Sequence, residues 1–293
     1  MKRKHFIQSL AITGMAGTTM KLNELGKIIQ PFGNTAAMPV LFLGHGSPMN
    51  AIEENEFVTG FRNIGKAIQK PTAILCISAH WETKGSFVTA MEHPPTIHDF
   101  GGFPQALFDV QYPAPGSPAL AKETQALVKT TRVALDQQWG LDHGAWSVIK
   151  HLYPAADIPV IQMSLDYTCT PQQHFDLAKE LAALRKKGVL IVGSGNMVHN
   201  LRVIDWRNPN GGYDWAVAAG NTMKKLIAGN DYQPLIKYSS LGKEVALSVP
   251  TPEHYLPLLY TLALKEEGEA LSFFNDKTVM GSIAMTSFKI GNA

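Results

Sequence analysis

One stretch of the sequence predicts the fold, and it reads Pro39-Val40-Leu41-Phe42-Leu43-Gly44-His45-Gly46-Ser47-Pro48. Its first half is apolar and is typical of a short, fully buried strand. The strand must end at Gly-His-Gly-Ser-Pro, because the glycines beside His45 permit positive φ and close backbone approach, and Pro48 fixes the exit. We therefore expect the His45 imidazole at the carboxyl end of a central strand, where open α/β sheets bind their ligands.

Two further stretches repeat this arrangement. Residues 73–78 form an apolar run that is followed by His80, and residues 188–192 form another that is followed by a glycine-rich segment and His199. Neighbouring parallel strands end at the same edge of a sheet, so we expect the three imidazoles to lie near one another. Histidines in these positions indicate a functional site rather than a core.

The rest of the chain predicts one α/β domain. Hydrophobic residues make up 45% of the 293 residues and charged residues 17%, which is enough for a large core. Strand and helix patterns alternate from Met38 onward, with helices expected over 52–69, 117–129 and 170–188 and a strand over 159–165. Residues 279–290 predict one or two strands that close the sheet edge. This alternation favours a mixed, mostly parallel sheet flanked by helices.

Composition argues against several other classes of protein. The formal net charge is only +2 and is spread without a basic block, so no nucleic-acid partner is expected. No stretch reaches the eighteen or so apolar residues that a membrane span needs. The two cysteines, Cys76 and Cys169, are too few for a disulfide framework.

Residues 1–37 are expected to be a leader or a disordered extension rather than part of the domain. The first eight residues are basic, and residues 9–20 are weakly apolar and rich in Ala, Gly and Thr, as in an export signal. Residues 3–8 are similar to a twin-arginine signal in which lysine replaces one arginine. The chain is therefore predicted to be cytoplasmic, or periplasmic if this leader is functional.

Histidine is the residue type that carries the chemistry. Of the ten histidines, His151 and His174 lie on amphipathic helices and are expected to be structural, and His5 belongs to the leader. His254 lies in Thr-Pro-Glu-His, where Thr251 predicts a helix cap and His254 falls in the first helical turn. Imidazoles without partnering thiolates suit Zn²⁺, Fe²⁺ or copper in a site of catalytic type.

Two other segments are expected near these histidines. His143 lies in a predicted loop that opens a helix, and it is a candidate acid–base group with Asp142 as its orienting partner. Residues 93–116 form a long segment rich in Pro, Gly and aromatic residues. Long loops inside compact domains are usually functional, so we expect this one to form a rigid wall over the strand ends.

Taken together, these motifs resemble the 4,5-DOPA dioxygenase extradiol family, which belongs to the class III (LigB-type) extradiol dioxygenases. The similarity extends over residues 38–290, with the motifs in family order. They are Gly44-His45-Gly46-Ser47-Pro48, Ser78-Ala79-His80-Trp81, Pro95-Thr96-Ile97-His98-Asp99-Phe100-Gly101-Gly102-Phe103-Pro104, Asp142-His143-Gly144, Gly195-Asn196-Met197-Val198-His199-Asn200 and Thr251-Pro252-Glu253-His254-Tyr255. The resemblance implies a LigB-type fold and a catalytic domain over residues 38–293.

The same resemblance implies an extradiol dioxygenase that opens a DOPA-like catechol with O₂ at a mononuclear metal. It implies one divalent ion per chain, Zn²⁺ or Fe²⁺, held by four histidines: His45, His80, His199 and His254. The wider class uses two histidines and a glutamate, so whether Glu253 or His254 faces the metal stays open.

The resemblance also implies roles for the remaining candidates. An imidazole near the metal must take a catechol proton and later return one, and His143 and His199 are the candidates. If His199 binds the metal, His143 is the acid–base group; if His199 is free, it is the better base. His98 and Phe100 would contact the substrate ring.

Two alternative functions remain at this stage. The same histidines could activate water in a zinc-dependent hydrolase, or they could bind metal without catalysis in a protein of the same fold. For the dioxygenase the expected partners are a small aromatic diol and O₂, and the oligomeric state is unknown.

Overall fold

A block of four parallel strands forms the centre of the structure, a computed structural model that describes residues 36–291. In spatial order these strands are β5 (Val160–Asp166), β2 (Ala73–Thr83), β6 (Val189–Gly195) and β1 (Val40–Gly44). They are almost continuously apolar and buried, as expected when helices cover both faces of a sheet. The register pairs Gly44 with Gly195 and Ser78 with Ser194, so β1, β2 and β6 reach the same edge.

Four shorter strands extend this block into a mixed eight-stranded sheet. On one side β3 (Ser86–Thr89) runs antiparallel to β5 and pairs with β4 (Val133–Asp136). On the other side β10 (Ser287–Ile290) runs antiparallel to β1 and pairs with β7 (Leu271–Phe274). The prediction of a mixed, mostly parallel sheet flanked by helices is confirmed.

The last strands differ from the expectation for residues 279–290. Only β10 joins the main sheet, and it lies inside it because β7 pairs with its outer side and forms the edge. Strands β8 (Thr278–Val279) and β9 (Ile283–Ala284) instead form a separate two-stranded sheet. The sequence pattern does not predict β7 as the edge strand, because β7 is only half-buried and lacks the apolar run of the central strands.

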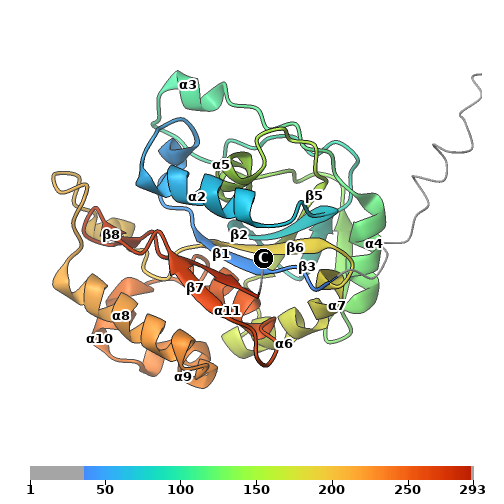
Figure 1. Ribbon diagram of the computed structural model, residues 1–293. Helices are drawn as coiled ribbons and strands as arrows, with labels where there is room; N and C mark the ends of the chain where they lie inside the picture. The colour runs from blue at the N-terminus through green and yellow to red at the C-terminus, as the bar shows by residue number, and fades with distance from the viewer. Residues whose placement is uncertain (1–35, 292–293) are drawn as a thin grey trace, which may run out of the picture. The chain divides into compact units, whose positions relative to one another are not determined.

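Helices cover both faces of the sheet (Figure 1). On one face α5 (His143–Leu152) packs on β2 and against α2 (Glu56–Ala67). On the opposite face α11 (Leu256–Ala263) packs on β6 and against α6 (Pro171–Glu180). The remaining helical segments are η1 (Pro48–Ala51), α3 (Gln105–Phe108), α4 (Pro118–Leu127), α7 (Ala182–Arg185), η2 (Leu201–Val203), α8 (Asp214–Ala228), α9 (Tyr232–Ile236), η3 (Tyr238–Ser240) and α10 (Lys243–Ser248).

Capping side chains set several of the helix starts. Asn55 accepts hydrogen bonds from two backbone N–H groups and starts α2 later than predicted, whereas Ser117 caps α4 as predicted. Thr170 and Gln173 form a capping box at α6, and the predicted helix over 170–188 is divided at Leu181 into α6 and α7. In the part of the chain that the structure describes, no helix is long and apolar enough to cross a membrane.

A buried arginine ties the start of the domain to its end. The Arg185 side chain is fully buried, and its Nε–H donates to the Met38 carbonyl at 2.7 Å. Its guanidinium also donates to the Leu264 carbonyl at 2.7 Å and forms an ion pair with Glu269. The Met38 N–H donates to the Arg185 carbonyl at 2.9 Å. The backbone is therefore anchored from Met38 onward, whereas the predicted leader up to residue 35 lies outside the described residues.

These contacts generate a prediction for truncated chains. A chain that begins at Thr35 retains both Met38–Arg185 hydrogen bonds, so its free energy of unfolding in urea should equal that of the full chain. A chain that begins at Leu41 is the control. This shorter chain leaves the Nε–H and the carbonyl of buried Arg185 without their Met38 partners. Its free energy of unfolding should fall by about 2 kcal/mol or more. A marked loss for the Thr35 chain would contradict the proposed boundary between residues 37 and 38.

Candidate functional site

His45 follows β1 directly and is held by the end of β6. Its backbone N–H donates to the Gly195 carbonyl at 3.2 Å, and its ring Nδ1 lies 3.0 Å from Ser194 Oγ. The Ser194 hydroxyl donates its own proton to the Gly144 carbonyl at 2.5 Å, so it accepts from Nδ1–H of His45. The lone pair of His45 therefore lies on Nε2. Gly46 turns the chain away at a positive φ of 62°, a conformation that favours glycine.

His80 lies within a strand and not beyond its end. The sequence predicts a strand that stops at Ser78, but β2 continues to Thr83. The pairing of β2 with β5 shifts register between Ile77 and Glu82, and irregularities of this kind re-aim side chains near active sites. His80 lies within the segment where the register shifts, and its Nε2 lies 3.3 Å from Nε2 of His45.

His254 reaches the site because its turn rests on the end of β6. Its carbonyl accepts the Asn196 N–H at 2.8 Å, and a Cβ on Gly195 would collide with the same carbonyl oxygen. Helix α11 begins only at Leu256, so His254 lies in the preceding turn and not in the predicted first helical turn. Nδ1 of His254 lies 3.3 Å from a Glu253 oxygen, which makes Glu253 a neighbour that orients the ring.

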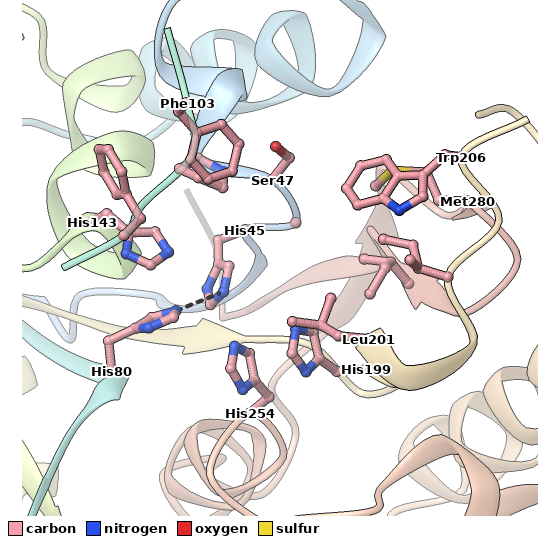
Figure 2. A pocket seen from close by; sticks show the side chains of 15 residues that line it. His45, Ser47, His80, Phe103, His143, His199, Leu201, Trp206, His254 and Met280 are labelled. Carbon is pink, nitrogen blue, oxygen red and sulfur yellow. Dashed lines mark hydrogen bonds between the residues drawn. The ribbon is translucent and has the colours of Figure 1, made fainter. Parts of the chain in front are cut away.

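His45, His80 and His254 form one cluster, which we call the histidine triad. One ring nitrogen from each lies within 4.8 Å of the other two, and the ring centroids are 5.0–5.2 Å apart. Figure 2 shows the three rings converging at the base of a pocket. His199 approaches from the side of His254. Its ring stacks on the His254 ring at 3.5 Å with an interplanar angle of 7°, and it groups with Glu253 and His254.

Burial keeps these imidazoles neutral. Loss of water lowers the pKa of His45 and His254 well below the ordinary value, and neighbouring histidines lower it further. Burial also lowers the pKa of His80 to about 3 and that of His199 to about 4. Neutral imidazole is the form that binds metals. The cluster is therefore ready for a cation at neutral pH.

The spacing of the donor atoms also suits a metal ion. If Nδ1 of His80 is protonated as in His45, two nitrogen lone pairs face each other across 3.3 Å, which is unfavourable without a cation between them. Two nitrogens bound at about 2.0–2.1 Å to one tetrahedral metal lie about 3.3 Å apart. The residues present therefore fit a divalent ion bound by nitrogen ligands.

His143 is the first residue of α5, and its partner differs from the one expected. Nδ1 of His143 lies 2.9 Å from Oδ2 of Asp99, and its backbone N–H donates to Oδ1 of Asp99 at 2.8 Å. Asp142, the predicted partner, instead caps α5 and binds Ser78 and Gln162 within the core. Burial and nearby Asp99 raise the pKa of the Asp142 carboxyl. The prediction that Asp142 orients His143 is therefore wrong.

The histidines lie at the base of a cavity of about 320 Å³ whose walls are mainly apolar. Phe100 lines the cavity, and its ring lies 5.4 Å from that of His143 in an edge-on arrangement. His98 does not line it, because its Nε2–H donates to the Val110 carbonyl at 3.0 Å and its ring packs behind Phe100. His98 therefore lies behind Phe100, and its contact with the ring of the substrate stays a prediction. The remaining apolar lining residues are Phe103, Leu201, Ile204, Trp206, Met280 and Ile283.

Several residues of the site are absent from the sequence-based prediction. Asp99 stands beside two predicted residues in its motif, but no sequence signal distinguishes it from Asp142. Ser194 falls in the glycine-rich segment predicted to follow the strand, and its bond to His45 depends on the pairing of β1 with β6. Trp206 is 71% exposed, lies on a loop and follows no periodic pattern. Such contacts are made by segments distant in sequence and need the tertiary structure.

Comparisons with known proteins agree on one family. Residues 35–238 match the family described as the catalytic LigB subunit of aromatic ring-opening dioxygenase. A 4,5-DOPA dioxygenase extradiol of Escherichia coli (strain K12) is 46% identical over 88% of this chain and 96% of its own length. A protein of the same name from Beta vulgaris is 35% identical over 85% of this chain and 94% of its own length. The crystal structure of an uncharacterized Escherichia coli K12 protein superimposes with a TM-score of 0.76 at 42% identity, over 87% of this chain and all of that chain.

The geometry of the histidine triad predicts the effect of single substitutions on metal binding. Replacing His45, His80 or His254 with alanine should abolish stoichiometric binding of Zn²⁺ in isothermal titration, because each supplies one of three converging nitrogens. The matched control is His98→Ala, which removes a half-buried loop histidine that does not line the cavity and should keep full stoichiometry. Full metal occupancy in two of the three triad variants would contradict a shared site.

Proposed function

The chain belongs to the family of the catalytic LigB subunit of aromatic ring-opening dioxygenases, which makes it an oxidoreductase, and we propose that it performs extradiol cleavage of a DOPA-like catechol. The observation that carries this proposal is the histidine triad at the base of an apolar cavity. The names of the Escherichia coli and Beta vulgaris relatives support the choice of substrate class.

We propose that His45, His80 and His254 hold one divalent ion, Fe²⁺ or Zn²⁺, with His199 as the fourth candidate ligand. Fe²⁺ bound there would supply a redox-active centre that brings the diol and O₂ together. The alternative roles of His199 follow from its position. Its ring is stacked on His254 at the cavity wall, so it either completes the ligand set or takes a substrate proton. Retained metal binding in His199→Ala would favour the second role.

His143 is the acid–base group in this proposal. Its Nδ1 faces Asp99, so the other ring nitrogen is available to the cavity that His143 lines. A neutral imidazole can take a proton from a catechol hydroxyl and later return it. The carboxylate of Asp99 would stabilise the imidazolium formed in between, because opposite charges at this distance favour the charged form.

The aromatic wall would orient the ring of the substrate. Phe100 and Phe103 line the inner part of the cavity, whereas Trp206 and Leu201 lie at its exposed rim. An aromatic ring between these side chains gains from apolar burial and from edge-to-face contacts. Its hydroxyl groups would then face the histidines, and its substituent would face the rim.

We also propose the domain boundaries and the cellular compartment that the sequence predicts. The catalytic domain comprises residues 38–293, preceded by the leader, and the protein acts in the cytoplasm or, if the leader is functional, in the periplasm.

The first test separates a dioxygenase from a zinc-dependent hydrolase. Protein loaded anaerobically with Fe²⁺ should convert catechols with alkyl substituents, once O₂ is added, to a product whose mass is the sum of substrate and O₂. Protein loaded with Zn²⁺ is the control and should consume no O₂, because zinc has no redox chemistry. If the zinc form hydrolyses esters while the iron form leaves catechols intact, the hydrolase would replace this proposal. Metal binding without either activity would favour the non-catalytic alternative.

The second test addresses His143. His143→Ala should keep its metal and bind catechol but turn over at least about a hundredfold more slowly, the usual cost of losing general acid–base catalysis. His93→Ala, an exposed histidine elsewhere on the chain, is the control and should keep normal turnover. A variant of His143 that loses its metal would make His143 a ligand. Near-normal turnover would remove it from the mechanism and leave His199 as the base.

A further inference from the structure

Asp99 lies between two imidazoles that have different tasks in the proposed function. Its Oδ2 lies 2.9 Å from Nδ1 of His143 and 3.4 Å from Nδ1 of His80. Its Oδ1 accepts the backbone N–H of His143 at 2.8 Å. The rings of His80 and His143 are themselves in contact, with centroids 3.8 Å apart. One carboxylate therefore touches a predicted metal ligand and the predicted acid–base group.

The surrounding backbone fixes the carboxylate in this position. The loop that carries Asp99 pairs with the segment leading into α5, through Ile97 N–H to the Leu141 carbonyl at 2.7 Å and Leu141 N–H to the Pro95 carbonyl at 2.8 Å. The indole N–H of Trp146, on α5, donates to the Ile97 carbonyl at 2.8 Å. These bonds connect the loop to the same helix that starts with His143. The distance between Asp99 and His143 is therefore set by local backbone pairing and not by flexible side chains alone.

The geometry around Asp99 determines which hydrogens face it. Its Oδ1 accepts the backbone N–H of His143 and its Oδ2 lies beside Nδ1 of both His143 and His80, so both oxygens face nitrogen atoms. An ionised carboxylate only accepts hydrogen bonds. A neutral imidazole that presents Nδ1 to it must carry its hydrogen on Nδ1 and its lone pair on Nε2.

We propose that Asp99 is a positioning residue that holds both His80 and His143 in the Nδ1–H tautomer. It thereby directs Nε2 of His80 toward Nε2 of His45 and Nε2 of His143 toward the cavity. The roles of these two nitrogens, metal binding and proton transfer, rest on the proposed function, whereas the tautomers do not. Carboxylates behind metal-binding histidines commonly act in this way, but here the same carboxylate serves two imidazoles.

The competing interpretation is that Asp99 is itself a metal ligand. Ligand atoms of His80, Asp99 and His143 lie within 4.8 Å of one another, as those of the histidine triad do. A positioning role is favoured because Oδ1 of Asp99 already accepts the backbone N–H of His143 at 2.8 Å, which places Oδ2 within 2.9 Å of Nδ1 of the same residue. The two interpretations differ in the expected number of bound ions.

The decisive variant is Asp99→Asn, which keeps the size of the side chain but leaves only one acceptor oxygen for three donors. Long-range ¹H–¹⁵N spectra of the metal-free protein, assigned with His80→Gln and His143→Gln, should show Nδ1–H for both rings in the unmodified chain. In Asp99→Asn at least one ring should change to Nε2–H. The affinity for Zn²⁺ should fall about 10- to 100-fold at unchanged stoichiometry, as for other partners of metal-binding histidines.

A matched control and a second variant keep the test decisive. Asp109→Asn alters an acidic residue of the same loop whose carboxylate binds only Gln105 among the described side chains, and it should change neither spectra nor affinity. If Asp99→Asn does not fold, Asp99→Ala provides the same readouts. Unchanged tautomers in the folded variants would overturn the proposal. A second equivalent of Zn²⁺ that binds the unmodified chain and is lost in Asp99→Asn would make Asp99 a ligand. If the tautomers change in Asp99→Asn but the unmodified chain loaded with Fe²⁺ cleaves no catechol, this inference is upheld and the proposed function is refuted.

Discussion

The parallel pairing of β1, β6 and β2 is the constraint on which the site depends. The register brings Gly44 beside Gly195 and Ser78 beside Ser194, so three chain segments leave the sheet at one edge. The strands are buried on both faces, and a one-residue slip would turn every side chain to the opposite face. The hydrophobic core thus fixes the relative positions of the segments that carry His45, His80 and His254 to within the distances of a metal site.

Burial then imposes a second requirement, because each buried imidazole needs a partner for its N–H group. Ser194 serves His45, Asp99 lies against His143 and His80, and Glu253 lies against His254. These partners orient the rings and leave the other nitrogens toward the cavity. Burial lowers the pKa of His45, His80 and His254, so the same burial that costs hydration prepares these rings as metal ligands.

The reacting groups and the walls of the cavity come from different parts of the fold. His80 lies within β2 and His143 begins α5, whereas His45 and His254 lie on segments whose backbone is hydrogen-bonded to the end of β6. The apolar wall comes from the loops that carry Phe100, Phe103 and Trp206. Loops tolerate change better than central strands. The lining of the cavity can therefore vary through these loops while the histidine triad is preserved.

The sequence by itself determined the α/β class, the strand-end placement of His45, the concentration of histidines near one edge of the sheet and the family. These features follow from local patterns: apolar runs, glycines beside histidine, and motifs in a fixed order. Only the tertiary structure decided that β2 continues past His80, that Asp99 and not Asp142 faces His143, that His254 and not Glu253 joins the triad, and that His98 lies behind Phe100. Each of these depends on the direction of a side chain, and that direction is set by contacts between segments far apart in the chain. Sequence spacing predicts which residues reach the sheet edge, but only packing decides which atoms meet there.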